Sequence, residues 1–308
     1  MSDSPLAEGE PGLQVTRLYS TAAEGHKAGS RRPASDARLR RELEAFLAGA
    51  DAAAMVRRDP VERVRQYARE DDQEVAGLLV AGLAYGRASV VRERTKALLD
   101  ALGPHPARAL AGPAGPRRLR GFVYRFQRGT DLPRYAGAIG RVRAEWGSLR
   151  AAFFDGFEPE GPGPWLDAMA RFVDRVRAHL QPPLSYGLRY LLPTPRSGAA
   201  KRLSLYLRWM VRPDDGVDLG TWGGPADRLL IPLDTHVARI GRYVGLTDRQ
   251  TAGLPAALDI TARLARLHPP DPLRYDMALC HLGISGACPT RRVPKICRSC
   301  PIRGICRL

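Results

Sequence analysis

Two short segments in the last third of the sequence carry the residue types that could do covalent chemistry. Lys201 follows a turn rich in Pro, Ser and Gly and lies near the start of a predicted helix over 199–212. Asp234 lies within 231–237, directly before an amphipathic run. An amine can act as a nucleophile, whereas an arginine side chain does not deprotonate and cannot. In a chain with 44 arginines and four lysines, we interpret Lys201 and Asp234 as an active-site pair.

Both side chains also have a structural interpretation. Asp is a preferred N-cap residue, worth about 1 kcal/mol to a helix, and from the residues alone capping is the favoured interpretation of Asp234. His236 is likewise expected to be a packed or capping residue rather than a catalyst. On the predicted helix, Lys201 shares a face with Arg208 and Arg212, because residues three to four apart lie on the same side. Lys201 would then be a phosphate contact.

The five cysteines all fall within the last twenty-nine residues. Clustered cysteines in a chain without an export signal are metal ligands more often than disulfides. Cys280 lies on a predicted helix and is expected in the core. The other four can converge on either a [4Fe–4S] cluster or a tetrahedral zinc. The single CxxC with Pro301 after it favours the cluster, with four ligands: Cys288, Cys297, Cys300 and Cys306.

The charge balance points to a polyanionic partner. The formal net charge is +16, which favours nucleic acid, although an arginine-rich proteome would also produce it. From Met277 to the end there is no Asp or Glu, against six Arg or Lys, so the cysteine segment is expected to present a basic face. The longest nearly apolar run, 75–85, is far shorter than the ~18–20 residues that span a bilayer. We expect a cytoplasmic protein that does not enter a membrane.

The hydrophobic pattern predicts an all-α protein, because period-2 alternation of β-branched residues is scarce throughout. Residues 1–35 lack apolar periodicity and are predicted to be a disordered basic leader. Gly86 is the expected C-cap of a buried helix, and 103–116 is the expected Pro/Gly-rich connection. Helices are predicted at 39–47, 74–85, 90–102, 132–145, 149–154, 165–180, 199–212, 235–244, 250–267 and 271–282.

Three of these segments together resemble the helix–hairpin–helix DNA glycosylases of the endonuclease III superfamily. That family carries Leu-Pro-Gly-x-Gly-x-Lys-Thr-Ala, then Val-Asp-Thr-His-Val-x-Arg, then a loop with four cysteines. This chain has Leu-Asp-Thr-His-Val-Ala-Arg at 233–239 and Cys-Arg-Ser-Cys-Pro-Ile-Arg-Gly-Ile-Cys at 297–306. Tyr-Arg-Phe at 124–126, Lys-Arg-Leu and Leu-Arg-Trp-Met are most similar to a bacterial branch with a conserved domain of unknown function. The resemblance covers roughly residues 55 to 308.

The resemblance implies a bilobed all-α fold over 36–308, with a DNA cleft between the lobes. A helical barrel would form one lobe at about 70–212. The second lobe would comprise 36–69 and 213–308, and the metal loop would be 288–306. The cluster would be structural and hold the basic loop in shape.

The resemblance also implies a reaction and its residues. A damaged base in duplex DNA would be flipped from the stack, and the protein would act as a nucleoid-associated monomer. Asp234 would stabilise positive charge on the sugar or deprotonate the lysine, and Lys201 would attack the anomeric carbon and form a Schiff base that permits β-elimination. The implied DNA contacts are Arg196, Gly198, Arg202, Arg291 and Arg292. The implied base-pocket residues are Tyr85, Arg87 and His236.

The sequence departs from the family pattern in three places. The hairpin has Gly198 in place of the paired Gly-x-Gly, an insertion lengthens the interval from Lys201 to Asp234, and the first cysteine gap has eight residues where the family has six. Two other functions therefore stay open. One is a non-catalytic nucleic-acid-binding protein on the same scaffold, and the other is an arginine-rich interaction protein stabilised by zinc.

Overall fold

The regular structure of the chain is helical. The computed structural model describes residues 34–308 except 161–162, 194 and 196–197, so the predicted leader lies almost entirely outside the described residues. Within the described part, the only β pairing is an isolated bridge between Tyr124 and Gln127, which confirms the all-α prediction. None of the described helices is both long enough and apolar enough to cross a membrane.

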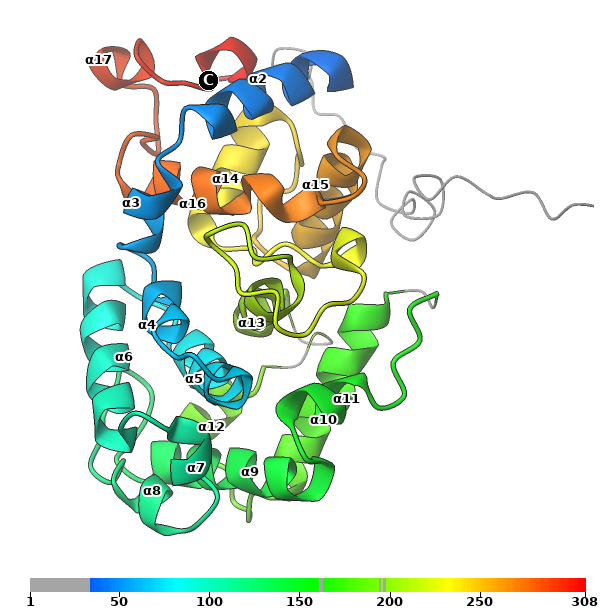
Figure 1. Cartoon of the computed structure of the whole chain (residues 1–308). Coiled ribbons are helices and arrows are strands. Elements are labelled where there is room, and N and C mark those ends of the chain that lie inside the picture. Colours follow the sequence, from blue (N-terminus) through cyan, green and yellow to red (C-terminus); the bar gives the residue numbers. More distant parts are fainter. Residues whose placement is uncertain (1–33, 161–162, 194, 196–197) are drawn as a thin grey trace, which may run out of the picture.

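The helices form two groups with α13 between them (Figure 1). One group comprises α4 (Val61–Arg65), α5 (Glu70–Gly82), α6 (Ala88–Leu102), α7 (Pro106–Ala109), α8 (Ala114–Arg117), α9 (Asp131–Trp146), α10 (Leu149–Phe154), α11 (Pro164–Ala178) and α12 (Tyr186–Leu191). The other comprises α2 (Asp36–Ala48), α14 (Thr235–Val244), α15 (Leu254–Leu267), α16 (Asp276–Ile284) and α17 (Pro294–Cys297). Helix α13 (Lys201–Val211) packs against α5 of the first group, and α3 (Ala52–Val56) packs against α16 of the second. Three 3₁₀ turns complete the described elements: η3 (Ala226–Arg228), η4 (Pro272–Tyr275) and η5 (Arg303–Ile305).

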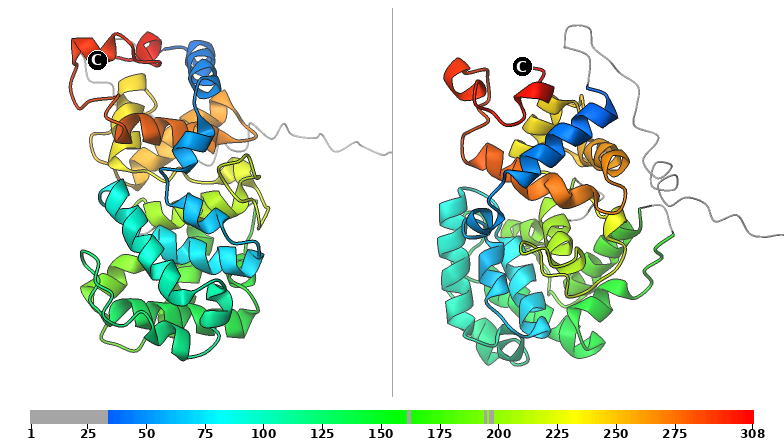
Figure 2. Two further views of the ribbon diagram at one scale, coloured as in Figure 1. Left: turned by 60° about the vertical axis from the view of Figure 1, so that its left-hand side comes forward. Right: turned by 45° about the horizontal axis from the view of Figure 1, so that its top comes forward.

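The two ends of the described chain lie side by side. Helix α2 packs against α15 and η5, and both views in Figure 2 show it beside the C-terminal segment. Leu39 and Leu43 of α2 belong to a hydrophobic core with residues from Leu230 to Ile305. A larger core is built mainly from residues between Val61 and Leu229. The bilobed division stays a prediction, but the segment 213–229, which the family resemblance assigns to the second lobe, packs in the larger core.

Helix α5 runs through the larger core and makes its most extensive contact with α13. Gly77 permits this approach, because a Cβ atom there would lie 2.8 Å from Met210 Cε and 3.1 Å from Tyr206 Cε2. The predicted end of α5 is wrong: the helix stops at Gly82, with Leu83 as its C-cap. Gly86, the expected cap, has a φ of +100° in the turn beyond. The residues after α5 are thereby free to form the wall of a cavity.

Short helices account for most of the missed elements. The predicted connection 103–116 contains α7 and the start of α8, and α12 falls where no helix was predicted. A helix of four to six residues is too short to show an apolar period, and its signals lie in its ends. Pro106 occupies the first turn of α7, and Ser185 caps α12 by accepting a hydrogen bond from the amide of Leu188 at 3.0 Å.

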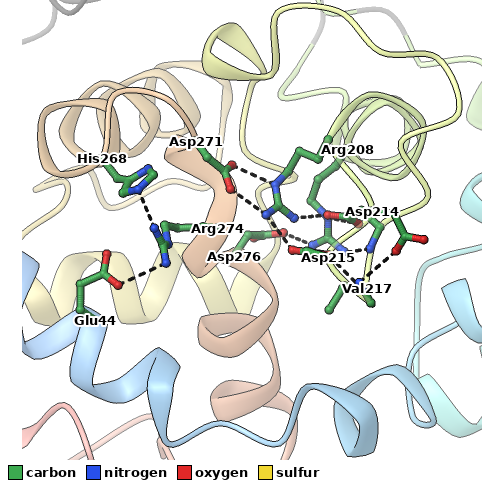
Figure 3. Close-up of polar contacts among 12 residues, drawn as sticks. Glu44, Arg208, Asp214, Asp215, Val217, His268, Asp271, Arg274 and Asp276 are labelled. Carbon is green, nitrogen blue, oxygen red and sulfur yellow. Dashed lines mark hydrogen bonds and ion pairs between the residues drawn. The ribbon is translucent and has the colours of Figure 1, made fainter.

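Helix α13 differs from prediction in its charged face. Arg208 and Arg212 are only 2% and 5% exposed and do not form an open basic face with Lys201. Arg208 Nε donates to Asp218 Oδ1 at 3.1 Å, and Arg212 donates twice to Asp271, at 2.9 and 2.8 Å. Figure 3 shows this buried network of ion pairs. The inserted loop after α13 covers the two arginines and supplies carboxylates for them.

Candidate active site

The lysine and the aspartate that the sequence pairs lie close together in space. Lys201 is the first residue of α13 and Asp234 is the N-cap of α14. Lys201 Nζ lies 3.8 Å from Asp234 Oδ2 and 3.4 Å from the carbonyl oxygen of Ala84. The side chain of Lys201 is 33% exposed and that of Asp234 13%. The amine is therefore reachable from solvent while the carboxylate is held in the wall.

The two carboxylate oxygens of Asp234 have different partners. Oδ1 accepts hydrogen bonds from the amides of His236 at 2.9 Å and Val237 at 2.7 Å. Oδ2 faces Lys201 and accepts a hydrogen bond from Cys280 Sγ at 3.5 Å. The capping interpretation of Asp234 is confirmed, and it does not compete with the pairing, because the cap uses one oxygen and fixes the direction of the other.

The Lys201–Asp234 pair lines a cavity of about 660 Å³. Its walls come from the turn after α5, from α13, from the start of α14 and from α16. The three residues predicted for the base pocket, Tyr85, Arg87 and His236, all line this cavity. Arg125 lines it as well, and both Arg87 and Arg125 are exposed. The cavity is large enough for a small organic group and has cations at its rim.

Two cavity residues on α16 were missed as site residues. Cys280 is not simply a core residue, since its thiol contacts Asp234, and burial raises its pKa well above the usual value. Asp276 is 2% exposed, and its Oδ1 has no hydrogen-bond partner among the described residues. Burial raises the pKa of Asp276 to about 6, against the opposing effect of Arg208. Their spacing of four residues on one predicted helix is the signal that could have found them.

A close approach between α14 and α16 brings these groups together. A Cβ atom at Gly283 would lie 2.5 Å from His236 Cβ, so only glycine allows the two helices to pack at this separation. Arg239 on α14 extends the contact, because its Nη2 lies 3.3 Å from His236 Nδ1 and donates to the carbonyl oxygen of Cys288 at 2.8 Å. The cavity wall and the cysteine segment thus share a hydrogen-bonded connection.

The four predicted metal ligands surround one hollow. Cys288, Cys297, Cys300 and Cys306 all line a cavity of about 390 Å³ near the C-terminus. Burial raises the pKa of the Cys288 and Cys300 thiols. Among the residues that the structure describes, no three His, Cys, Asp or Glu side chains form a group that could hold one metal ion. The four cysteines thus line one shared space.

The predicted DNA contacts have different surroundings. Arg291 and Arg292 are exposed between the first two cysteines of the hollow. Gly198 is half-buried, with open space where a Cβ would be. Arg202 is 8% exposed and donates to the carbonyl oxygens of Gly82, at 3.1 Å, and Tyr190, so it does not face solvent as a phosphate contact would. Arg196 lies outside the described residues.

Comparison with known proteins identifies one family. The model of a family described as "Protein of unknown function (DUF2400)" matches residues 59–285, a span that includes Lys201, Asp234, Asp276 and Cys280. No curated protein and no solved structure matches the chain.

Proposed function

Because the chain belongs to the DUF2400 family, whose function is unknown, we propose a function from the chemistry of the site: a DNA glycosylase with AP-lyase activity. The observation that carries the proposal is the amine of Lys201 lying 3.8 Å from Asp234 Oδ2 at the wall of an open cavity. The resemblance of these segments to helix–hairpin–helix glycosylases supports the same assignment.

In the proposed reaction, Asp234 accepts a proton and Lys201 acts as the nucleophile. Asp234 Oδ2 accepts a proton from the Lys201 ammonium, and the free amine attacks the anomeric carbon of a flipped nucleotide. The bond from that carbon to the base breaks, and the base leaves with the bonding electrons and takes up a proton. Opening of the sugar ring then gives a Schiff base on Lys201. β-Elimination then removes a proton from the C2′ carbon, forms a C2′–C3′ double bond and breaks the bond from C3′ to the 3′ oxygen, which leaves with the 3′ phosphate and so cleaves the strand.

The surroundings of the pair support this chemistry. The amide hydrogen bonds to Oδ1 keep Asp234 from rotating away from the lysine, and a group held in this way loses little freedom when it acts. The cations Arg87 and Arg125 at the rim suit the phosphates on either side of a flipped nucleotide. A cavity of about 660 Å³ falls in the range of small-molecule sites.

For the cysteine hollow we propose a [4Fe–4S] cluster held by Cys288, Cys297, Cys300 and Cys306. A zinc ion, with Zn–S bonds of about 2.3 Å, needs four sulfurs gathered around a point, whereas a cluster occupies a volume between its ligands. The hollow of about 390 Å³ that the four cysteines line has room for a cluster, and the single CxxC followed by Pro301 favours it. When bound, the cluster would serve to shape the basic segment that carries Arg291 and Arg292.

Borohydride trapping on DNA that contains an abasic site tests the lysine. We expect the wild-type chain to form a covalent complex, because reduction fixes the Schiff base. Lys201→Ala should form none and should still bind the same DNA. Trapping that persists at the wild-type level in Lys201→Ala would show that another amine is the nucleophile.

Two substitutions at Asp234 separate its role as a cap from its role in chemistry. Asp234→Asn retains an oxygen for the amides of His236 and Val237 but removes the charge that faces the lysine. It should lower the trapping rate by roughly 10²-fold or more with little change in the free energy of unfolding. Asp234→Ala should lose the same activity and about 1 kcal/mol of stability in addition. Equal trapping in Asp234→Asn and wild type would leave the cap as the only role of this residue.

The second candidate is non-catalytic nucleic-acid binding on the same scaffold. It is favoured by the completeness of the cap, since two amide hydrogen bonds account for Asp234 without any reaction. Wild-type protein that binds abasic DNA tightly and gives no trapped complex, across duplexes with several different lesions, would support this candidate over the enzyme.

A further inference from the structure

An aromatic surface extends outward from the mouth of the active-site cavity. Tyr85 lines the cavity, and its ring centroid lies 4.8 Å from that of Tyr190 and 6.0 Å from that of Phe126, with the latter ring nearly parallel. Phe126 in turn lies 5.3 Å from Tyr186. Phe126 is 42% exposed and Tyr186 57%. Rings that would normally be buried are therefore presented to solvent in a connected series.

The surface is held rigidly from beneath. Arg202 places its guanidinium carbon 4.1 Å from the ring centroid of Tyr190 and 5.4 Å from that of Tyr85, and it donates to the carbonyl oxygen of Gly82 at 3.1 Å. Phe126 is carried on a tight turn that places Arg125 at a φ of +48°, a conformation that costs a non-glycine residue roughly 1–2 kcal/mol. This buried support explains what Arg202 does in place of a phosphate contact.

The exposed charges on the segments that carry these rings are of one sign, since the neighbouring Asp131 is fully buried. Residues 117–130 and 175–213, which carry Phe126, Tyr186 and Tyr190, contain no Asp or Glu. Arg125, Arg128 and Arg189 are exposed on the same two segments. Rings combined with cations and without acids are the composition that binds a polynucleotide strand, where bases stack on the rings and phosphates meet the cations.

We propose that this surface, which comprises Tyr85, Phe126, Tyr186 and Tyr190 and which we term the aromatic platform, binds unpaired nucleobases next to the target nucleotide. The inference rests on the proposed function, because it makes the substrate a single-stranded or locally unpaired stretch of DNA. In an intact duplex the bases already stack on one another and gain nothing from a protein ring. In an unpaired strand each base can gain stacking on the platform. A strand lying on these rings would lead into the cavity at Tyr85.

The test compares binding of four oligonucleotides of one sequence: single-stranded DNA, fully paired duplex, duplex with a short unpaired bubble, and single-stranded RNA. Each carries 2-aminopurine, whose fluorescence is quenched when it stacks on a ring. Lys201→Ala serves as the starting protein, so that no chemistry occurs. We expect the single-stranded and bubble DNA to bind about tenfold or more tightly than the duplex, with quenching. If single-stranded RNA binds as tightly as single-stranded DNA, the platform accepts both kinds of nucleic acid. Weaker RNA binding would restrict the platform to DNA.

Matched substitutions show whether the rings are responsible. Phe126→Leu and Tyr186→Leu keep apolar bulk but remove the ring, and each should weaken single-strand binding by roughly tenfold or more and abolish the quenching. Phe126→Tyr and Tyr186→Phe keep the ring and should bind like the starting protein. The proposal is overturned if the ring-removing variants bind as tightly as the ring-keeping ones, or if duplex is preferred. A failed trapping experiment with intact platform binding would refute the proposed reaction alone.

Discussion

Asp276 shows how a side chain behind the Lys201–Asp234 pair responds to the charge of Asp234. Its carboxyl is buried beside Arg208 and lines the same cavity as Asp234. Burial is the largest influence on its pKa, and the negative charge of Asp234 acts in the same direction. The attraction to Arg208 does not outweigh these two effects, in part because Asp218 shares that arginine. The net effect is a raised pKa for Asp276.

The raised pKa of Asp276 predicts a pH-dependent stability with a definite sign. The folded pKa is about 6 and the ordinary value is 3.8, so between these pH values the folded state keeps a proton that the unfolded chain has released. The free energy of unfolding should therefore decrease as the pH rises from about 4 to about 6, by up to roughly 3 kcal/mol. Asp276→Asn cannot titrate and should lack this decrease.

Urea unfolding of the wild type and of Asp276→Asn, at steps from about pH 4 to about pH 7, measures the effect as a difference. The comparison cancels the contribution of all other titrating groups to first order. The free energy of unfolding of the variant should rise relative to wild type with increasing pH. Parallel curves would mean that Asp276 is ionised throughout and is fully neutralised by Arg208.

Helices with strong capping signals at their ends could be predicted from the sequence. Features of a helix that depend on the segments packed against it could not. The predicted helix 235–244 matches α14 at both ends, because Asp234 caps it and Gly245 ends it in the left-handed region. For α13, the sequence indicates which side is apolar. It cannot indicate that Asp218, in the loop after α13, and Asp271, far along the chain, cover the polar side.

The same distinction applies to the site. The Lys201–Asp234 pair followed from residue types and a family pattern, whereas Cys280 and Asp276 carry no motif. Their role depends on the distance between α14 and α16, which is set by the packing at Gly283. The need for a glycine at position 283 becomes visible only in the structure, where α14 and α16 pack against each other.

Gly283→Ala tests this dependence of the site on helix separation. The new Cβ atom would lie 2.5 Å from His236 Cβ, which cannot swing away, so α14 and α16 must move apart. We expect a loss of about 1–3 kcal/mol in the free energy of unfolding. Trapping with abasic DNA should slow as well, because Cys280 and Asp234 lie on either side of this contact.

Gly137→Ala in α9 is the matched control. A Cβ atom there would meet no atom closer than 3.5 Å, the Nη1 of a flexible arginine. The substitution should raise the free energy of unfolding by about 0.5–1 kcal/mol, because alanine has less freedom to lose than glycine in a helix. Its trapping rate should equal that of wild type. Loss of trapping in both variants would show that the assay reports on helix content and not on the α14–α16 contact.

The fold as a whole joins the cysteine segment to α2, at the start of the described chain, and to α14. Ile302 and Ile305 pack in the same core as Leu39 and Leu43 of α2. The amide of Arg307 donates to the carbonyl oxygen of Tyr243 at 2.7 Å. A cofactor that orders the cysteines would therefore stabilise the contacts of α2 and of α14 as well as its own loop.

This connection predicts a global effect of removing one cysteine. Cys297→Ser should abolish the visible absorption, iron and sulfide expected of a cluster, and it should lower Tm by several degrees, at about 2–4 °C for each kcal/mol lost. Cys280→Ser is the control, because Cys280 does not line the cysteine hollow and a serine hydroxyl can still donate to Asp234. It should keep its iron and its absorption. Stoichiometric zinc in the wild type, lost in Cys297→Ser and retained in Cys280→Ser, would replace the cluster with a zinc site while leaving the structural role of the four thiols in place.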